Sequence, residues 1–406
     1  MSAESQPYVG PRPFTREDAR LFFGRDREAN DLVSLIISHA EVLLYAQSGA
    51  GKTSLINAKL WDLLVGEGLE VLPVARMQGP PSPVLPMSKI NNIYIFNTLV
   101  TWAEKTANPL ELAGMTLKEM LQTLFSGSDK ERVPFVAVFD QFEELFTAYP
   151  ECWDQRHGFF VQVREALDAY PQMRALFAMR EDYLGAVAPY ASTMPEKFRV
   201  RFHLENLREP QAIEAVEGPL SKGRPERHFA PGVAKKLVEE LMKVEVETAG
   251  GQTESIVGEF VEPVQLQVVC ERLWRDLKDE DTEITSEHLE KISVEKALLS
   301  FYEESIKAVA DKTGISEQTL RSWFERKLVT PAGTRGMAFR GETETEGLPN
   351  EAVDALDQLH LIRSERRGGG RKWYELTHDR FIDAIQKSRQ RLLQNLQAGT
   401  EETTAA

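Results

Sequence analysis

The sequence predicts an α/β fold built on a parallel β-sheet, followed by a helical region and a winged helix. Between residues 23 and 205, short and continuously apolar runs alternate with longer segments of helical period. Continuous apolarity is typical of parallel strands that are buried on both faces. One such run leads directly into the Gly-rich stretch AQSGAGKTS, residues 46–54. Near the end of the chain, LIRSERRGGGRKWYELTHD (residues 361–379) predicts two strands around a glycine turn.

Composition and charge are those of an ordinary globular chain. Its 406 residues are 42% hydrophobic and 27% charged, and this length predicts about two to four domains. The formal net charge of −15 argues against general binding to nucleic acid or to an anionic membrane. The sequence shows no secretory signal and no apolar run of the ~18 residues that a membrane helix needs. We therefore expect a cytoplasmic protein with no membrane partner, in which Cys152 and Cys270 are buried reduced thiols.

The order of strand-like and helical segments divides the chain into regions. The strand-like runs are EVLLY (41–45), LEVLPVARM (69–77), VPFVAVF (133–139) and MRALFAM (173–179). After residue 205 the signals become helical, since Val233, Leu237 and Leu241 recur every four residues. We predict a lead segment, a sheet domain, a helical lid domain, a winged-helix domain and a disordered tail, at residues 1–22, 23–205, 206–290, 291–395 and 396–406.

The stretch AQSGAGKTS has the pattern of a phosphate-binding loop between a strand and an amphipathic helix. In such a loop, backbone N–H groups point at the phosphates, a lysine neutralises their charge, and a Ser or Thr hydroxyl ligates Mg²⁺. Ala46 replaces the first glycine of the pattern, and alanine is tolerated there if its φ stays negative. We expect Thr53 on the metal ion, and nucleotide contacts from Ser48, Gly49, Ala50, Gly51, Lys52, Thr53 and Ser54.

The run VPFVAVF is followed by Asp140, where a P-loop fold places the carboxylate of its magnesium shell. Glu143 and Glu144 follow closely, and either could activate a water molecule as a general base. If DQFEELF (residues 140–146) opens a helix, Asp140 and Glu143 lie one turn apart on the same side. The alternative is that the two glutamates only stabilise the N-terminus of a helix.

Arg180 directly follows the strand-like run MRALFAM. A cation at the end of a neighbouring strand can reach the γ-phosphate and report whether it is present. The alternative is a surface arginine that pairs with Glu181 or Asp182. The sequence has no NKxD-type guanine signature, so adenine is the expected base.

Several of these motifs together resemble a known family. The lead YVGPRPFTREDARLFFGRDREANDLVSLI (residues 8–36) resembles the start of the STAND NTPases, the signal-transduction ATPases with numerous domains. It is most similar to the bacterial novel STAND group, which shares a Pro-Phe segment before FFGR-x-x-E. DQFEELF and the Arg-x-Asp sequence that begins at Arg180 also match this group, and the resemblance covers about residues 8–385.

The resemblance implies roles for further residues. Gly24 and Arg25 would line the adenine side, and Arg180 would be sensor 1. Pro263 would lie near the base in the helical lid, although it also fits the first position of a helix. His378 resembles the "MHD" histidine, which reaches from a winged helix to the β-phosphate of ADP and holds the closed form; a core or capping role is the alternative. Family members usually carry an effector domain and a repeat sensor, so we expect separate effector or sensor proteins as partners.

Two classes of function follow from these observations. The first is an ATP/ADP switch with Mg²⁺ that is closed with ADP, self-associates with ATP and hydrolyses it slowly, in bacterial signalling or defence. The second is an origin-recognition-like DNA-binding ATPase. The helix expected to enter the groove, residues 349–360, carries Glu351, Asp354 and Asp357 but no Lys or Arg, which argues against this alternative. The basic wing between Arg363 and Lys372 could bind a phosphate backbone or an acidic partner. A metabolic kinase or GTPase would need a guanine motif or a small-substrate site, and the sequence shows neither. We predict the switch.

Overall fold

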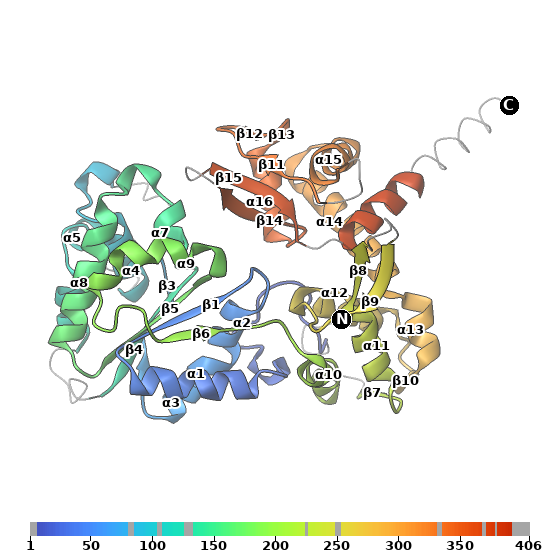
Figure 1. The fold of residues 1–406 in the computed structure, drawn as a ribbon, viewed down its shortest axis with the longest axis horizontal. Coiled ribbons are helices and arrows are strands. Elements are labelled where there is room, and N and C mark those ends of the chain that lie inside the picture. Colours follow the sequence, from blue (N-terminus) through green and yellow to red (C-terminus); the bar gives the residue numbers. More distant parts are fainter. Residues whose placement is uncertain are drawn as a thin grey trace, which may run out of the picture. The chain divides into compact units, whose positions relative to one another are not determined.

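The computed structural model divides the chain into two compact units (Figure 1). Residues 13–205 form one unit, and the residues before 13 and after 205 form the other. Within the described ranges, no helix is long and apolar enough to cross a membrane. The structure describes residues 6–79, 85–103, 108–125, 133–223, 226–247, 253–330, 335–367, 371–377 and 380–391.

The unit of residues 13–205 is built on a parallel β-sheet. Its strands are β1 (Glu41–Ala46), β2 (Glu70–Val71), β3 (Ala75–Arg76), β4 (Phe135–Asp140), β5 (Met173–Arg180) and β6 (Arg201–His203). They lie in the order β2–β4–β5–β1–β6, and β3 also pairs with β4. Because every pair is parallel, the carboxyl ends of the strands meet at one edge of the sheet. Strand β5 separates β1 from β4, and the predicted parallel-sheet α/β fold is confirmed.

Helices cover both faces of this sheet. Along β1, Leu43 contributes to one hydrophobic cluster, whereas Val42 and Leu44 contribute to another. Phe139 and Val138 divide in the same way along β4, and this alternation places one cluster on each face. Two buried faces explain why the strands are continuously apolar in sequence. The helices are α1 (Asp26–Ser38), α2 (Lys52–Leu55), α3 (Trp61–Gly66), α4 (Ile93–Trp102), α5 (Pro109–Leu112), α6 (Leu117–Phe125), α7 (Glu144–Thr147), α8 (Gln155–Ala169) and α9 (Leu184–Val187).

The run LEVLPVARM forms two short strands, β2 and β3, instead of one. Pro73 lies between them, and proline has no N–H group to donate to a sheet ladder. Its carbonyl oxygen instead accepts a hydrogen bond of 3.0 Å from Trp102 Nε1. Beyond the break, Arg76 comes into register with Asp140 at the carboxyl end of β4. The interruption therefore brings a basic residue to the same sheet edge as the acidic one.

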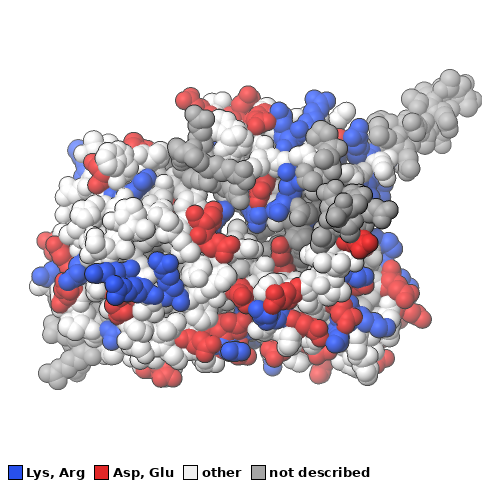
Figure 2. Space-filling model, viewed as in Figure 1, with Lys and Arg blue, Asp and Glu red and all other residues white. Residues whose placement is uncertain are grey.

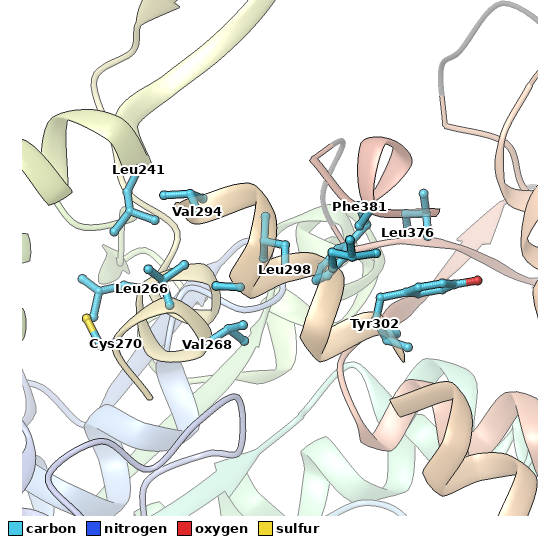
Figure 3. Close-up of a cluster of buried hydrophobic side chains, with 14 of the residues drawn as sticks. Leu241, Leu266, Val268, Cys270, Val294, Leu298, Tyr302, Leu376 and Phe381 are labelled. Carbon is cyan, nitrogen blue, oxygen red and sulfur yellow. The ribbon is translucent and has the colours of Figure 1, made fainter. Parts of the chain in front are cut away.

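The second unit has one continuous hydrophobic cluster. In Figure 3, Leu241 and Leu266, from the segment predicted as a lid, lie near Val294 and Leu298 of α14. Phe381, which follows the wing, packs against Phe301 of α14, with 6.0 Å between the ring centroids. The predicted lid and winged-helix regions thus share a core. The labelled helices are α10 (Glu209–Glu217), α11 (Val233–Met242), α12 (Pro263–Asp276), α13 (Ser286–Ile292), α14 (Val294–Thr313), α15 (Glu317–Trp323) and α16 (Asn350–Gln358), and residues 380–391 are also helical.

The region of residues 206–290 is not entirely helical, contrary to the sequence interpretation. Strands β8 (Lys243–Glu247) and β9 (Thr253–Val257) form an antiparallel hairpin. Strands β7 (His228–Phe229) and β10 (Glu283–Ile284) pair in parallel. The β8 sequence KVEVE alternates valine with charged residues, which is the period of a strand.

The predicted strands around the three glycines are confirmed. Strands β14 (Ile362–Arg367) and β15 (Arg371–Leu376) pair antiparallel, and β11 (Ala338–Phe339) pairs with the other side of β15. A small separate hairpin joins β12 (Glu344–Thr345) and β13 (Leu348–Pro349). These strands follow helices α14 and α15 and enclose α16 in the chain order expected of a winged helix.

The lead segment is divided between the two units at residues 12 and 13. Before the division, the Tyr8 hydroxyl donates a hydrogen bond of 2.6 Å to the Val216 carbonyl oxygen of the same unit. On the other side, the Phe14 ring packs edge-to-face on Phe22, with 5.1 Å between the ring centroids. The chain therefore crosses between the units near residue 12 and again near residue 205.

Candidate functional site

The stretch 46–54 joins the carboxyl end of β1 to a helix. Ala46 is the last residue of β1, is fully buried, and does not have a positive φ. The left-handed conformations fall instead on Gly49, with a φ of 85°, and on Gly51, with a φ of 98°. Gly51 caps a helix that runs through α2, a π-helical turn at Ile56–Leu60 and α3. The loop thus has glycine where its backbone requires it, and Ala46 meets the condition for tolerating alanine.

Lys52 lies over the loop that precedes it. Its Nζ donates hydrogen bonds of 3.2 Å to the carbonyl oxygens of Ala46 and Gln47. Burial lowers the pKa of Lys52, and the carboxylates of Glu143 and Asp140 oppose this effect. The ammonium group is thus held between the loop carbonyls and two carboxylates. Within the loop, Ser48 and Gly49 are exposed and Ala50 is buried.

Thr53 and Asp140 bring the loop and strand β4 together. The Thr53 hydroxyl donates a hydrogen bond of 2.7 Å to Asp140 Oδ2. The other carboxylate oxygen, Asp140 Oδ1, is buried and has no hydrogen-bond partner among the described residues. A hydroxyl and a carboxylate are hard oxygen ligands of the kind that Mg²⁺ prefers. The buried, unpaired oxygen therefore fits a magnesium site that these two residues would hold.

The segment after Asp140 is a turn rather than the start of a helix. Gln141 has a φ of 49°, and α7 begins only at Glu144. The Phe142 amide donates a hydrogen bond of 2.8 Å to the Ala178 carbonyl oxygen of β5. Its ring is fully buried between other phenylalanines, with a centroid 4.8 Å from that of Phe177. This apolar anchor overrides the helical continuation that the sequence suggested.

The two glutamates have different surroundings. Glu143 Oε2 accepts a hydrogen bond of 3.3 Å from the Arg180 amide. Burial raises the pKa of Glu143, and the nearby charge of Lys52 lowers it. Glu144 pairs with the Arg76 guanidinium and accepts a hydrogen bond of 2.9 Å from the Gln78 amide. Glu143 thus lies beside the phosphate-loop lysine, whereas Glu144 is bound to β3 and the loop that follows it.

Arg180 ends β5 and is paired with Asp182. The guanidinium donates two hydrogen bonds to this carboxylate, of 3.0 Å from Nε and 2.8 Å from Nη2. Burial disfavours the charged guanidinium, but Asp182 outweighs it, so the pKa of Arg180 is raised. Only 13% of the side chain is exposed. The carboxylate pairing that the sequence offered as an alternative is therefore present, and the side chain nevertheless lies at the buried edge of the sheet.

Arg25 fastens the helix before β1 to the phosphate loop. It is the N-cap of α1 and follows Gly24, which has a φ of 80°. Its Nη2 donates hydrogen bonds of 3.1 Å to the Ala50 carbonyl oxygen and 2.7 Å to that of Glu205. Burial lowers the pKa of Arg25, and its ion pair with Glu28 opposes this effect. Arg25 thus holds the phosphate loop in place through the Ala50 carbonyl oxygen.

Ser54 contacts the lead segment. Its hydroxyl oxygen accepts a hydrogen bond of 3.2 Å from the Phe14 amide, and both residues are buried. Trp61 lies two turns further along the same helix. The guanidinium of Arg16, from the lead segment, lies 4.5 Å from the centre of its ring. The lead segment therefore packs along the helix that follows the loop.

The two remaining candidates belong to the second unit. Pro263 is the first residue of α12, where the missing N–H of proline costs no hydrogen bond. His378 lies outside the described residues, so its expected contact with ADP stays a prediction.

In the wing, the charges that the structure describes are largely paired. Arg363 Nε donates a hydrogen bond of 2.6 Å to Glu375. On α16, Asp354 accepts hydrogen bonds from Arg340 and from the Tyr374 hydroxyl. In Figure 2, acidic and basic side chains lie side by side over the region of α15 and β12. Side chains of Arg366, Arg367 and Arg371 lie outside the described part of the wing.

Two residues at the carboxyl edge of the parallel sheet, Arg76 and Gln141, were not identified by the sequence analysis. Arg76 Nη2 donates hydrogen bonds to the side-chain oxygens of both Gln141 and Glu144. A signal for Arg76 was present, since it follows an apolar run just as Asp140 and Arg180 do. No sequence pattern indicated the left-handed backbone of Gln141, because glutamine has no preference for it.

The loop of residues 46–54, the end of β4 at Asp140 and the end of the intervening strand β5 at Arg180 thus form the edge of a P-loop site. A family model described as Novel STAND NTPase 1 matches residues 7–401. The chain belongs to this family. The predicted P-loop NTPase fold and the predicted family are both confirmed, and members of such P-loop families bind nucleotide together with Mg²⁺.

Comparison with curated proteins finds no match. Among solved structures, the chain is similar to the Walker-type ATPase of Pyrococcus abyssi, with 14% identity, a TM-score of 0.46, and coverage of 92% of this chain and 98% of that one. It is also similar to the ORC2 protein of Aeropyrum pernix in ADPNP–ADP complexes, with 16% identity, a TM-score of 0.43, and coverage of 91% and 94%. The ORC1 protein of Aeropyrum pernix in complex with DNA gives 14% identity, a TM-score of 0.43, and coverage of 95% and 98%.

Proposed function

We propose that this novel STAND NTPase is an adenine-nucleotide switch that binds ADP or ATP with Mg²⁺ at the loop of residues 46–54. The observation that carries the proposal is the 2.7 Å hydrogen bond between Thr53 and Asp140. It joins the two residue types that hold Mg²⁺ in P-loop sites, at the sheet edge where β1 and β4 both end. When bound, Mg²⁺ would neutralise phosphate charge and orient the γ-phosphate.

The residues at this edge support a division of roles. Lys52 would release the carbonyl oxygens of Ala46 and Gln47 and bind the phosphates. Glu143 would act as the general base on a water molecule, because it lies beside Lys52 and is not bound to Arg76 as Glu144 is. Burial raises the pKa of both glutamates, so their surroundings and not their pKa values separate the two roles. Arg180 would contact the γ-phosphate and distinguish ATP from ADP.

The switching behaviour is inferred from family membership and the resemblance of the C-terminal region. His378 would hold ADP in a closed form, with Pro263 and Gly24 near the base. Exchange for ATP would release the winged helix and allow self-association, and hydrolysis would be slow because the signal is a shift in population. Separate effector or sensor proteins would read the open form in signalling or defence.

The DNA-binding alternative gains no support from the described part of the wing. Arg363 is paired with Glu375, and α16 carries Glu351, Asp354 and Asp357 but no Lys or Arg. Carboxylates on the helix that should enter the groove would repel the phosphate backbone.

The nucleotide site can be tested by identifying the nucleotide released on denaturing the purified protein and by measuring affinities for fluorescent ADP and ATP. Lys52→Ala should abolish binding. Lys59→Ala is the matched control, because Lys59 lies on the same helix but pairs with Asp26. Unchanged nucleotide affinity in Lys52→Ala would refute the site.

The switch can be tested by light scattering after size exclusion in ADP and in a slowly hydrolysed ATP analogue. We expect near-stoichiometric ADP in the isolated protein and a larger mass with the ATP analogue. His378→Ala should shift the bound nucleotide from ADP toward ATP and increase self-association. Equal masses in both nucleotides, together with an unchanged nucleotide pool in His378→Ala, would contradict the switch while leaving the binding site in place.

A further inference from the structure

Arg76, Gln141 and Glu144 form a group at the carboxyl edge of the sheet, which we call the Arg76 clasp. Arg76 lies opposite Asp140 in the β3–β4 register. Its Nη2 donates to Gln141 Oε1 and to Glu144 Oε1. The second Glu144 oxygen accepts the 2.9 Å hydrogen bond from the Gln78 amide. Both ends of the clasp therefore hold the turn that lies between Asp140 and α7.

The turn inside the clasp is strained. Gln141 has a φ of 49°, in the left-handed region that residues with a Cβ rarely adopt. Strained residues of this kind persist only where their surroundings hold them, and they concentrate at functional sites. Two backbone hydrogen bonds contribute, from the Phe142 amide to Ala178 and from the Glu144 amide to Gln141. The Arg76 guanidinium holds the side chain of the strained residue itself.

The consequence of the turn is a separation of two neighbouring carboxylates. Only 9% of the Glu144 side chain is exposed, and it faces Arg76. The Glu143 carboxylate instead accepts a hydrogen bond from the Arg180 amide and is close enough to Lys52 to feel its charge. Asp140, immediately before the turn, keeps one oxygen bound to Thr53 and one without a partner. A change in the backbone at Gln141 would redirect Asp140 and Glu143 together.

We propose that Arg76 is a positioning residue that, through Gln141 and Glu144, sets the direction of the Asp140 and Glu143 carboxylates toward the phosphate loop. This inference rests on the proposed nucleotide site and adds a residue that orients the carboxylates beside its magnesium ion. Arg76 touches neither phosphate nor water in this role. A purely structural Arg76 would only neutralise the buried Glu144, and its removal would lower stability without affecting magnesium.

The test measures how much Mg²⁺ tightens binding of a fluorescent ATP analogue, as the ratio of the Kd without Mg²⁺ to the Kd with it. In Arg76→Ala, we expect this ratio to fall about tenfold, as after the loss of a charge-assisted hydrogen bond. The Kd without Mg²⁺ should stay unchanged, and single-turnover hydrolysis should fall by about 100-fold. Arg76→Lys should restore most of the ratio, because an ammonium can also donate to both oxygens.

Two further variants keep the test decisive. Arg164→Ala is the matched control, since Arg164 is similarly exposed and pairs with Asp168 on α8 at 2.7 Å. Gln141→Gly should fold well, because glycine adopts a φ of 49° without strain, and it should still lose magnesium coupling, because without the clasped side chain the glycine backbone is free to leave that conformation. A wild-type Mg²⁺ ratio in Arg76→Ala or in Gln141→Gly would overturn the positioning role. Absence of nucleotide binding by the wild-type protein would instead overturn the proposed function.

Discussion

Glu41 is a buried carboxyl group whose charge should make the stability of the protein depend on pH. It begins β1, its side chain is fully buried, and Oε1 accepts a hydrogen bond of 2.7 Å from the Phe198 amide. The other oxygen is buried and has no partner among the described residues. Burial raises the pKa of Glu41 from 4.5 to about 7, and the carboxylate of Glu196 adds to this rise while Arg164 opposes it.

The pKa difference sets the size and the sign of the effect. Each pKa unit corresponds to 1.36 kcal/mol, so the difference between 4.5 and about 7 corresponds to about 3 kcal/mol. Between these pH values the folded protein keeps a proton that the unfolded chain has lost. The free energy of unfolding should therefore decrease as the pH rises from 4.5 to about 7, and the full loss should be present above that range.

Glu41→Gln should remove this dependence, because glutamine keeps the acceptor for Phe198 without a charge. We expect the variant and the wild type to be similar near pH 5 and the variant to be more stable by about 3 kcal/mol at pH 8. Urea denaturation followed by hydrogen exchange of peptides from β1 measures this unit alone. Glu196→Gln should weaken the pH dependence only in part, since Glu196 is half-buried, is bound to His39 and the Ala40 amide, and adds to the raised pKa of Glu41. A constant stability difference between variant and wild type from pH 5 to pH 8 would refute the reasoning.

Two more predictions concern the loop and the turn. Gly51→Ala should cost about 1–2 kcal/mol because an alanine must take the left-handed conformation, and it should weaken nucleotide binding. Gly232→Ala, at the left-handed N-cap of α11, should cost as much with no effect on binding, and equal affinities in the two variants would contradict the role of Gly51. Phe142→Ala should lower the free energy of unfolding by about 3–5 kcal/mol and also reduce the tightening of ATP binding by Mg²⁺. A stability loss without any effect on magnesium would show that the Phe142 anchor does not position Asp140.

The fold of the first unit could be predicted because its signals are local. Parallel strands buried on both faces must be continuously apolar, and the ends of β1, β4 and β5 could be located from Ala46, Asp140 and Arg180. Parallel strands also share a carboxyl edge, so Thr53 and Asp140 could be expected at the same edge, whereas the strand order that brings them into contact was not predicted. The roles assigned to these residues with nucleotide are still predictions.

The features that escaped prediction depend on contacts between distant segments. The turn at Gln141 is imposed by Phe142, which packs against Phe159 of α8 and Phe177 of β5, both outside the local segment. The break in LEVLPVARM at Pro73 could have been foreseen, but its effect on the register of Arg76 could not. Likewise, a helical period in neighbouring segments obscured the strand alternation of KVEVE in β8.

The two glutamates show how one residue of displacement changes chemistry. In a continuous helix starting at Asp140, Glu143 and Glu144 would lie about 100° apart, and both could approach the phosphate loop. The left-handed Gln141 delays the helix until Glu144, so that Glu143 belongs to the turn and Glu144 to the first turn of α7. Arg76 then pairs with Glu144 and leaves Glu143 beside Lys52. Glu143→Gln should therefore abolish hydrolysis and preserve ATP binding, whereas Glu144→Gln should weaken the effect of Mg²⁺ on binding. Assays of hydrolysis and of binding with and without Mg²⁺ should thus tell the two variants apart.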